Sequence, residues 1–234
     1  MSDKVSPLEI PSGLILKNYA TDFVIYGGIL LVLSLFWGDL LLMNVSQLWR
    51  FDAIGLTHVW WLFAWAVVGA FINEAKWSYD SKPMLLARAT WLSLNAGFWE
   101  ELKYRWLLFF TAMITIPFAN FITFGLVWQV NHHILIPLAN WATFGALAPQ
   151  LYAENWVLAA AIISAAGAFR DAHKYQGWQG VIQTWFLGMV FFWLTFNYGI
   201  VTAMVAHAAY DLILLVAEAL KSERPLFFHR RLRQ

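Results

Sequence analysis

Long apolar stretches separated by short polar segments run along most of the chain. The first, from Thr21 to Met43, is long enough to cross a membrane, because a bilayer core of about 30 Å requires about 20 helical residues. Further stretches predict membrane helices at these positions: Leu56 to Ile72, Met84 to Phe124, Phe118 to Leu147, Trp156 to Phe169, Gly180 to Phe196 and Gly199 to Ala219. The stretch that begins at Trp156 is rich in alanine, which is typical of a tightly packed internal helix. The pattern predicts an all-α fold, a polytopic bundle of transmembrane helices.

The number of spans depends on the stretch from Met84 to Phe124, which Asn95-Ala96-Gly97 interrupts. If one span ends near Gly97 and the next begins at Trp99, the chain has about eight spans, and this is the number we expect. If the stretch is a single long helix, the total is seven. We expect one transmembrane domain over residues 19–220, without an internal repeat.

Two basic segments predict the orientation of the chain. The connection from Asn73 to Arg88 carries three basic residues, with Pro83 as a helix breaker. The tail over residues 221–234 carries five basic residues against one acidic residue. Since basic loops stay on the cytoplasmic side of a membrane, eight spans place both termini in the cytoplasm. Residues 1–18 lack the features of a signal peptide, and we interpret them as a polar N-terminal leader.

The composition supports an integral, multi-pass membrane protein and excludes several other classes. The 234 residues are 61% hydrophobic and only 12% charged, with a mean hydropathy of +0.59. A net charge of +1 argues against a nucleic-acid surface. The absence of cysteine excludes disulfides, thiolate nucleophiles and cysteine-ligated metal centres. The composition therefore predicts that the protein lies in a bilayer, and it leaves the oligomeric state open.

A charged cluster lies between two of the apolar runs. Glu100 and Glu101 are adjacent, and Arg105 follows one helical turn after Glu101, so that Glu101 and Arg105 can form an ion pair. On this spacing alone the pair is more often structural than catalytic. Glu100 lies about 100° further round the helix and has no local partner. Because an unpaired carboxylate is costly in a membrane, Glu100 is expected to face a polar group on a neighbouring helix.

Two more polar groups lie within or beside apolar stretches. His173 follows Phe169 by one turn at the end of the alanine-rich segment. His207 and Asp211 lie one turn apart in the middle of the last predicted span. An imidazole and a carboxylate at this depth are expected to face the interior of the bundle or a water-filled cavity.

In order along the chain, these residues form the patterns Glu-Glu-x-x-x-Arg, Phe-x-x-x-His and His-x-x-x-Asp. The chain thus resembles the CPBP family of intramembrane glutamate proteases, which includes the CAAX-processing enzyme Rce1 and Abi-type bacteriocin-immunity proteins. The resemblance covers about residues 96–215, the expected catalytic half.

The resemblance implies an intramembrane endopeptidase in which Glu100 is the general base that activates a water. It implies that Glu101 and Arg105 support Glu100, and that His173 positions the water and transfers a proton. His207 and Asp211 occupy the position at which the family stabilises the oxyanion.

Asp211 departs from many family members, which have asparagine there. An ionised carboxylate cannot donate a hydrogen bond to an oxyanion, so Asp211 either orients His207, is protonated, or is a metal ligand. Two histidines with carboxylates are plausible zinc ligands. A zinc-dependent form of the same hydrolysis, with Glu100, His173, His207 and Asp211 as ligands, is therefore the alternative to the metal-free, cofactor-free reaction that we expect.

A non-enzymatic membrane protein is the alternative from a different class. Buried carboxylates and histidines also form proton relays, so the same residues suit a proton-coupled transporter or an immunity-type binding protein. For the enzyme, the expected partner is a peptide or protein substrate in or at the membrane. A prenylated CAAX tail, a sorting signal, a leader peptide and a toxin all remain open as its identity.

Overall fold

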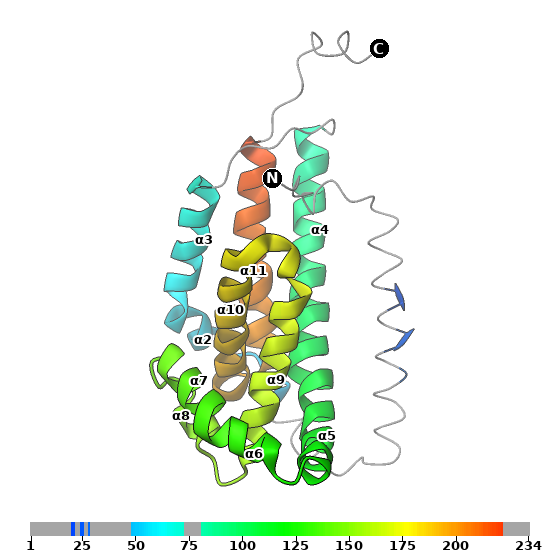
Figure 1. Ribbon diagram of the computed structural model, residues 1–234. Coiled ribbons are helices and arrows are strands. Elements are labelled where there is room, and N and C mark those ends of the chain that lie inside the picture. Colours follow the sequence, from blue (N-terminus) through cyan, green and yellow to red (C-terminus); the bar gives the residue numbers. More distant parts are fainter. Residues whose placement is uncertain (1–19, 22–23, 26–27, 29–47, 73–80, 222–234) are drawn as a thin grey trace, which may run out of the picture.

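The computed structural model describes residues 20–21, 24–25, 28, 48–72 and 81–221. Within these ranges the chain forms helices and no strand (Figure 1), which confirms the all-α class. The elements are α2 (Ala53–His58), α3 (Trp60–Ile72), α4 (Lys82–Glu101), η2 (Leu102–Leu108), α5 (Phe109–Ile122), α6 (Leu126–Val130), η3 (Asn131–Leu135), α7 (Ile136–Ala142), α8 (Ala148–Leu151), α9 (Trp156–Ala172), η4 (Lys174–Gln176), α10 (Gly177–Tyr198) and α11 (Ile200–Lys221).

The stretch that contains the glutamates is one continuous helical rod. It runs over 41 residues, Lys82–Ile122, with the π-helix η2 between α4 and α5. The predicted break at Asn95-Ala96-Gly97 is wrong, because Gly97 serves close packing instead. A Cβ at Gly97 would lie 2.7 Å from Ala208 Cβ and 2.7 Å from the Met204 carbonyl oxygen, so α4 and α11 could not approach as they do.

Pro83 begins a helix instead of breaking one. It lies in the first turn of α4, after the N-cap residue Ser81, where the missing backbone N–H of proline has no helical partner to lose. The connection predicted over Asn73 to Arg88 therefore ends at Ser81, and Arg88 belongs to α4.

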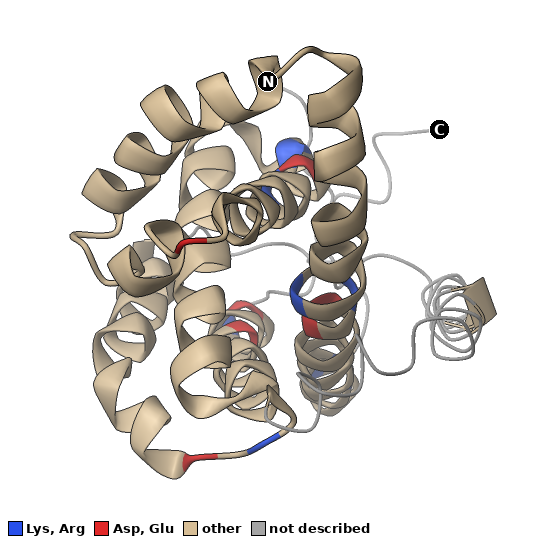
Figure 2. Ribbon diagram, turned by 90° about the horizontal axis from the view of Figure 1, so that it is seen from below, with Lys and Arg blue, Asp and Glu red and all other residues tan. Residues whose placement is uncertain are grey.

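The predicted span from Phe118 to Leu147 is also wrong. α5 ends at Ile122, and turns at Phe124-Gly125 and Phe144-Gly145 leave a helical segment, Leu126–Ala142, between them. This segment runs across the end of the bundle instead of along it (Figures 1 and 2). Both turns lie within an apolar stretch, so the hydrophobic pattern did not predict them.

The two turns come from a short repeat, contrary to the expectation of none. Ala-Asn-x-x-Thr-Phe-Gly occurs at 119–125 and again at 139–145. In each copy the phenylalanine and glycine have positive φ, at 52° and 87° in the first and 51° and 76° in the second. The glycine N–H donates to the asparagine carbonyl in both. This left-handed ending, which glycine favours, terminates the helix in both places.

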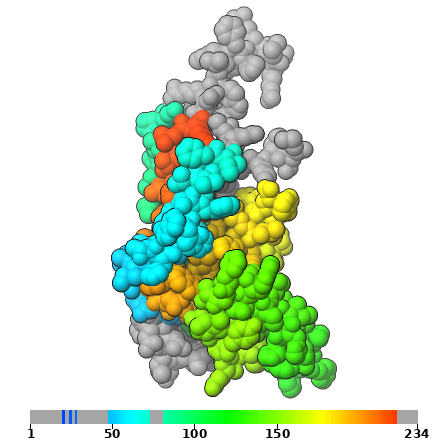
Figure 3. All heavy atoms as spheres, turned by 90° about the vertical axis from the view of Figure 1, so that its left-hand side faces the viewer, coloured from blue at the N-terminus to red at the C-terminus, as the bar shows by residue number. Residues whose placement is uncertain are grey.

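The core is built around α11. α4 packs along one side of α11 and α3 along another, while α9 lies between α5 and α10. Figure 3 shows α2 and α3 covering a flank of α11, next to the α7 and α8 end of the molecule. The buried alanines of α9 confirm the predicted tight packing: Ala159, Ala160, Ala161, Ala165 and Ala166. Few charged residues lie on the described helices (Figure 2), as a bundle surrounded by lipid requires.

Three described stretches are long and apolar enough to span a membrane: Lys82–Ile122, Lys174–Tyr198 and Ile200–Lys221. The predicted span from Leu56 to Ile72 is divided at Val59, and α3 has only 13 residues. The eight-span total required a break at Gly97 that the helix does not have. Residues 1–18, most of the stretch from Thr21 to Met43, and residues 222–234 lie outside the described residues, so the total number of spans stays a prediction.

Lysines join the ends of three helices at one end of the bundle. Lys82 Nζ donates to the Leu220 carbonyl at 3.0 Å, and Lys221 Nζ donates to the carbonyls of Ala70 and Phe71. The start of α4 and the end of α11 therefore lie at the same end. Between them the chain passes along the bundle in α4–α5, α9, α10 and α11 (Figure 1).

Candidate active site

The ion pair predicted from the Glu101–Arg105 spacing is present. Arg105 Nε lies 3.2 Å from Glu101 Oε2, and both side chains are fully buried at the junction of α4 and η2. The π-helix η2 begins directly after Glu101 and contains Arg105, and π-helical segments are rare overall but frequent at functional sites.

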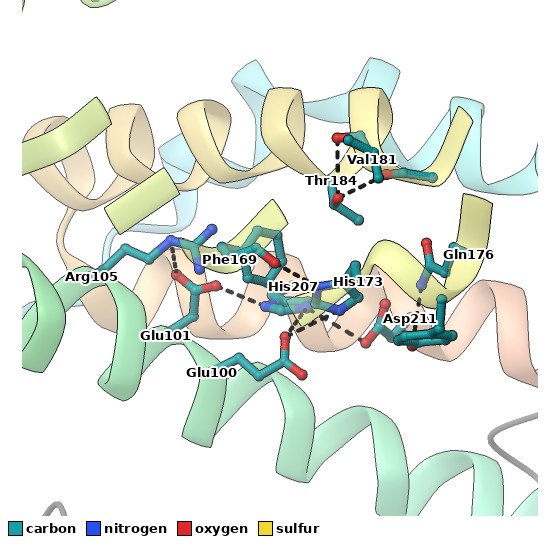
Figure 4. Close-up of polar contacts among 12 residues, drawn as sticks. Glu100, Glu101, Arg105, Phe169, His173, Gln176, Val181, Thr184, His207 and Asp211 are labelled. Atoms are coloured by element: carbon teal, nitrogen blue, oxygen red, sulfur yellow. Dashed lines mark hydrogen bonds and ion pairs between the residues drawn. The ribbon is translucent and has the colours of Figure 1, made fainter. Parts of the chain in front are cut away.

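Glu101 has a second partner that sequence reasoning missed. Its Oε1 accepts a hydrogen bond from His207 Nδ1 at 2.7 Å, which joins α4 to α11 (Figure 4). Gly97 lies one turn before Glu101 on the same face of α4. The close approach of the two helices at Gly97 therefore brings the Glu101 carboxylate within reach of His207.

His173 is fixed by the end of its own helix. Its Nδ1 donates to the Phe169 carbonyl at 2.8 Å, one turn earlier in α9. A carbonyl oxygen can only accept, so the proton lies on Nδ1, and the Nε2 atom is directed towards Glu100. Nε2 lies 3.8 Å from Glu100 Oε2.

Both imidazoles converge on the same oxygen of Glu100. His207 Nε2 lies 3.9 Å from Glu100 Oε2 and 3.5 Å from Asp211 Oδ2. These separations are too long for good direct hydrogen bonds and suit groups that share a small bridging molecule. The six residues singled out in the sequence thus form one cluster contributed by three segments, α4–η2, the end of α9 and α11 (Figure 4).

The cluster is closed at one end and open at the other. Glu101, Arg105 and His207 are buried, whereas Glu100 and Asp211 keep 27% and 28% of their side chains exposed. A substrate can reach the open end, so Glu100 combines access with two histidine neighbours.

The Arg105 guanidinium is surrounded by aromatic rings. Its Cζ lies 4.3 Å from the centre of the Phe169 ring, 5.2 Å from Phe191 and 5.7 Å from Phe192. Phe169 belongs to a recognised pattern, but the sequence does not distinguish the two α10 phenylalanines from lipid-facing ones. Arg105 is therefore sealed from substrate and can act only through Glu101.

A second charged group lies outside the cluster. Asp171 Oδ1 accepts from Arg170 Nε at 2.8 Å, and its Oδ2 lies 3.1 Å from Lys174 Nζ. These hydrogen bonds, first from Arg170 and then from Lys174, lower the pKa of the Asp171 carboxyl. Asp171 is thus paired with Arg170 and Lys174 at the surface. Glu100 and Asp211 are the accessible carboxylates of the cluster.

Across the described part of the chain, no three His, Asp or Glu side chains are arranged to hold a metal ion. His173 Nδ1 and His207 Nδ1 both make hydrogen bonds, so the Nε2 atoms are the ring nitrogens of these two histidines that could bind a metal ion.

An apolar cavity of about 460 Å³ lies beside α10. Its lining includes Phe186, Met189, Val190 and Trp193 of α10, together with His58. The lining includes none of Glu100, Glu101, Arg105, His173, His207 and Asp211. The cavity therefore does not contain the polar cluster.

A comparison with protein families matches the part of the chain that contains this cluster. A family model described as type II CAAX prenyl endopeptidase Rce1-like matches residues 82–213, from the start of α4 to just beyond Asp211. Comparisons with curated proteins and with solved structures give no match. The matched range includes every residue of the cluster and more than half of the 234 residues. The chain therefore belongs to the Rce1-like family of type II CAAX prenyl endopeptidases, a family of integral membrane hydrolases.

Proposed function

We propose that the protein is a glutamate-type intramembrane endopeptidase in which Glu100 is the general base. The observation that carries this proposal is the convergence of His173 Nε2 and His207 Nε2 on Glu100 Oε2, at 3.8 and 3.9 Å. Family membership implies a membrane-associated protein substrate, and the partly exposed Glu100 offers the accessible acid that hydrolysis requires.

In the proposed reaction, a water lies between Glu100 and His173 and loses a proton to the Glu100 carboxylate. The water oxygen forms a bond to the carbonyl carbon of the scissile peptide, and the carbonyl oxygen becomes an oxyanion. The C–N bond then breaks, and the leaving amine takes the proton from Glu100, with His173 Nε2 assisting the transfer.

His207 is proposed to stabilise the oxyanion. A protonated His207 has an N–H on each ring nitrogen, one for Glu101 and one for the developing negative charge. A single donor of this kind contributes about 2.7–4 kcal/mol of transition-state stabilisation. Asp211, 3.5 Å from Nε2, holds the ring on the side that faces the substrate.

The test is cleavage of peptide reporters by purified protein in detergent or liposomes. The reporters carry a prenylated CAAX-type tail, the same tail without the lipid, or an unrelated leader sequence. We expect Glu100→Gln to lower kcat by at least about 100-fold, the usual contribution of a general base. Glu154→Gln, an equivalent change at an exposed position between α8 and α9, is the control and keeps full activity.

Two results would contradict the proposal. Cleavage by Glu100→Gln at the wild-type rate would remove Glu100 from the reaction. Loss of activity on treatment with a chelator, restored by zinc, would replace the metal-free mechanism by the zinc-dependent one. We expect the chelated protein to keep its activity within about twofold, since general-base chemistry requires no metal.

A further inference from the structure

The inference concerns the aromatic rings that enclose the two partners of Glu101, and it depends on the function proposed above. Arg105 is fully buried, and in the described structure its Nη1 and Nη2 atoms have no hydrogen-bond partner. Among the described residues, the counter-charge in contact with it is Glu101, at 3.2 Å. The faces of the surrounding rings therefore have to stabilise most of the guanidinium.

The three phenylalanines around Arg105 differ in what else they touch. Besides Arg105, the Phe192 ring contacts the rings of Phe109 and Phe196, whose centres lie 5.7 and 6.1 Å from its own. Phe191 instead lies flat against His207, with ring centres 4.7 Å apart and an interplanar angle of 18°. Phe191 is thus the α10 ring that contacts both Arg105 and His207.

These contacts close a loop of four side chains. Arg105 pairs with Glu101, Glu101 accepts from His207, His207 stacks on Phe191, and the Phe191 ring lies 5.2 Å from Arg105. A hydrogen bond at Nδ1 fixes one direction in the plane of an imidazole but leaves the ring free to tilt about that direction. A flat ring against its face removes this freedom.

We propose that Phe191 is a positioning residue for the hydrolysis. It sets the plane of the His207 imidazole, so that Nε2 remains aimed at Glu100 and at the oxygen of the scissile carbonyl. It acts through His207 and does not itself touch substrate, because its side chain is fully buried. Nothing in the sequence distinguishes Phe191 from Phe192. Their contacts in the structure are different.

Removing the flat ring while keeping an apolar side chain separates this role from packing. Leucine fills part of the same space as phenylalanine but has no flat ring to lie against an imidazole. At position 191 we expect kcat to fall by about tenfold or more with KM nearly unchanged, since small misplacements of a catalytic group are costly. At position 192, which also contacts Arg105 but not His207, the same replacement should change kcat by less than about threefold.

A second measurement does not depend on activity. In protein with labelled histidines, the ring protons of His207 should resonate upfield because they lie over the Phe191 face. Phe191→Leu should abolish this upfield shift, and Phe192→Leu should leave it in place. Histidine signals are assigned from the loss of one resonance in His207→Asn.

The outcomes separate the two proposals. If Glu100→Gln is inactive while Phe191→Leu leaves kcat unchanged, or lowers it no more than Phe192→Leu does, Phe191 is a packing residue and this inference is wrong. An absent upfield shift at His207 would also overturn it. If Glu100→Gln keeps wild-type activity, the proposed function fails whatever the Phe191 variants do.

Discussion

At the scale of single residues, two carboxylates that are adjacent in the chain have different surroundings. Glu101 is wholly buried between the Arg105 guanidinium and the His207 imidazole, with one oxygen directed at each. Glu100 is partly exposed, and the two imidazole Nε2 atoms approach it no closer than 3.8 Å. We therefore expect Glu101 to matter chiefly for stability and Glu100 chiefly for the reaction.

Glu101→Gln should destabilise the protein by about 3–5 kcal/mol, because it leaves Arg105 buried without a counter-charge. Glu100→Gln should cost less than about 1 kcal/mol, since its side chain has no close ion pair to lose. Thermal unfolding in detergent measures both. The double change Glu101→Gln with Arg105→Met should recover part of the loss, because it removes both charges. Equal midpoints for Glu101→Gln and the wild type would show that the pair contributes nothing.

Asp211→Asn should keep kcat within about threefold of the wild type, because the amide fills the same space and can still contact His207. Asp211→Leu should lower kcat by at least about tenfold, since it removes the polar contact to Nε2. Initial rates of reporter cleavage measure the difference. An Asp211→Asn protein as inactive as Glu100→Gln would mean that the charge itself is required, as a metal ligand or as a second acid.

The sequence was sufficient for some of these contacts and not for others. Helical spacing alone predicts the Glu101–Arg105 pair, because it depends only on the geometry of one helix. The hydrogen bond from His207 to Glu101 depends on the distance between two helices that are far apart in the chain. The role of Phe191 is hidden for a different reason, because the sequence contains 19 phenylalanines and most membrane helices have them on several faces.

At the scale of the helices, Gly97 decides how close α4 lies to α11. Sequence reasoning treated it as a break, since glycine weakens helices. The same lack of a side chain also allows helix contact, and only the neighbouring helix reveals which effect applies. The ends of α9, α10 and α11 were predicted well because apolar runs end there, whereas the two Thr-Phe-Gly turns lie inside an apolar run.

Gly97→Ala should lower stability by about 1–3 kcal/mol, as other overpacking changes do, and should reduce cleavage because Glu101 moves away from His207. Gly69→Ala is the matched control. Gly69 also lies in a helix that faces α11, but its added Cβ would meet Leu214 Cδ2 at an ordinary 3.4 Å. Unfolding midpoints and initial rates for the two variants are compared. The close-packing role of Gly97 is wrong if the two alanine variants behave alike.

At the scale of the whole molecule, the described chain from Lys82 onwards returns at Leu220 to the end of the bundle at which α4 begins. Lys82 Nζ donates to the Leu220 carbonyl, so the start of α4 and the end of α11 lie at one end of the bundle. We expect this end to face the cytoplasm, as the positive-inside rule predicts for the basic segments next to it. The segment Leu126–Ala142 lies across the other end, and we expect it to add no crossing. An even number of crossings between the two basic segments stays a prediction from charge, and so does the total number of crossings.

The chain contains no cysteine, so single cysteines can report topology directly. Phe124 and Phe144 are 100% and 93% exposed, one at each end of the transverse segment. We expect Phe124→Cys and Phe144→Cys to be labelled by a membrane-impermeant reagent from the same side, opposite to the side that labels Ser81→Cys. The unsubstituted protein is the blank. Labelling of positions 124 and 144 from opposite sides would make the segment a span.

The π-helix between α4 and α5 has a consequence for how this region tolerates insertions and deletions. α4 packs on α11 and α5 packs on α9, so the two halves of one rod serve different neighbours. The wider turns of Leu102–Leu108 set the angular phase between these halves. Each π-helical residue turns the chain by about 80° instead of about 100°, so seven π residues turn about as far as six α residues. Losing one residue there would restore ordinary helix and leave α5 facing α9 almost as before. Losing one residue from the ordinary helix of α4 or α5 would instead rotate α5 by about 100° relative to α4. The π-helix is thus the one place in the rod where a single deletion could be absorbed.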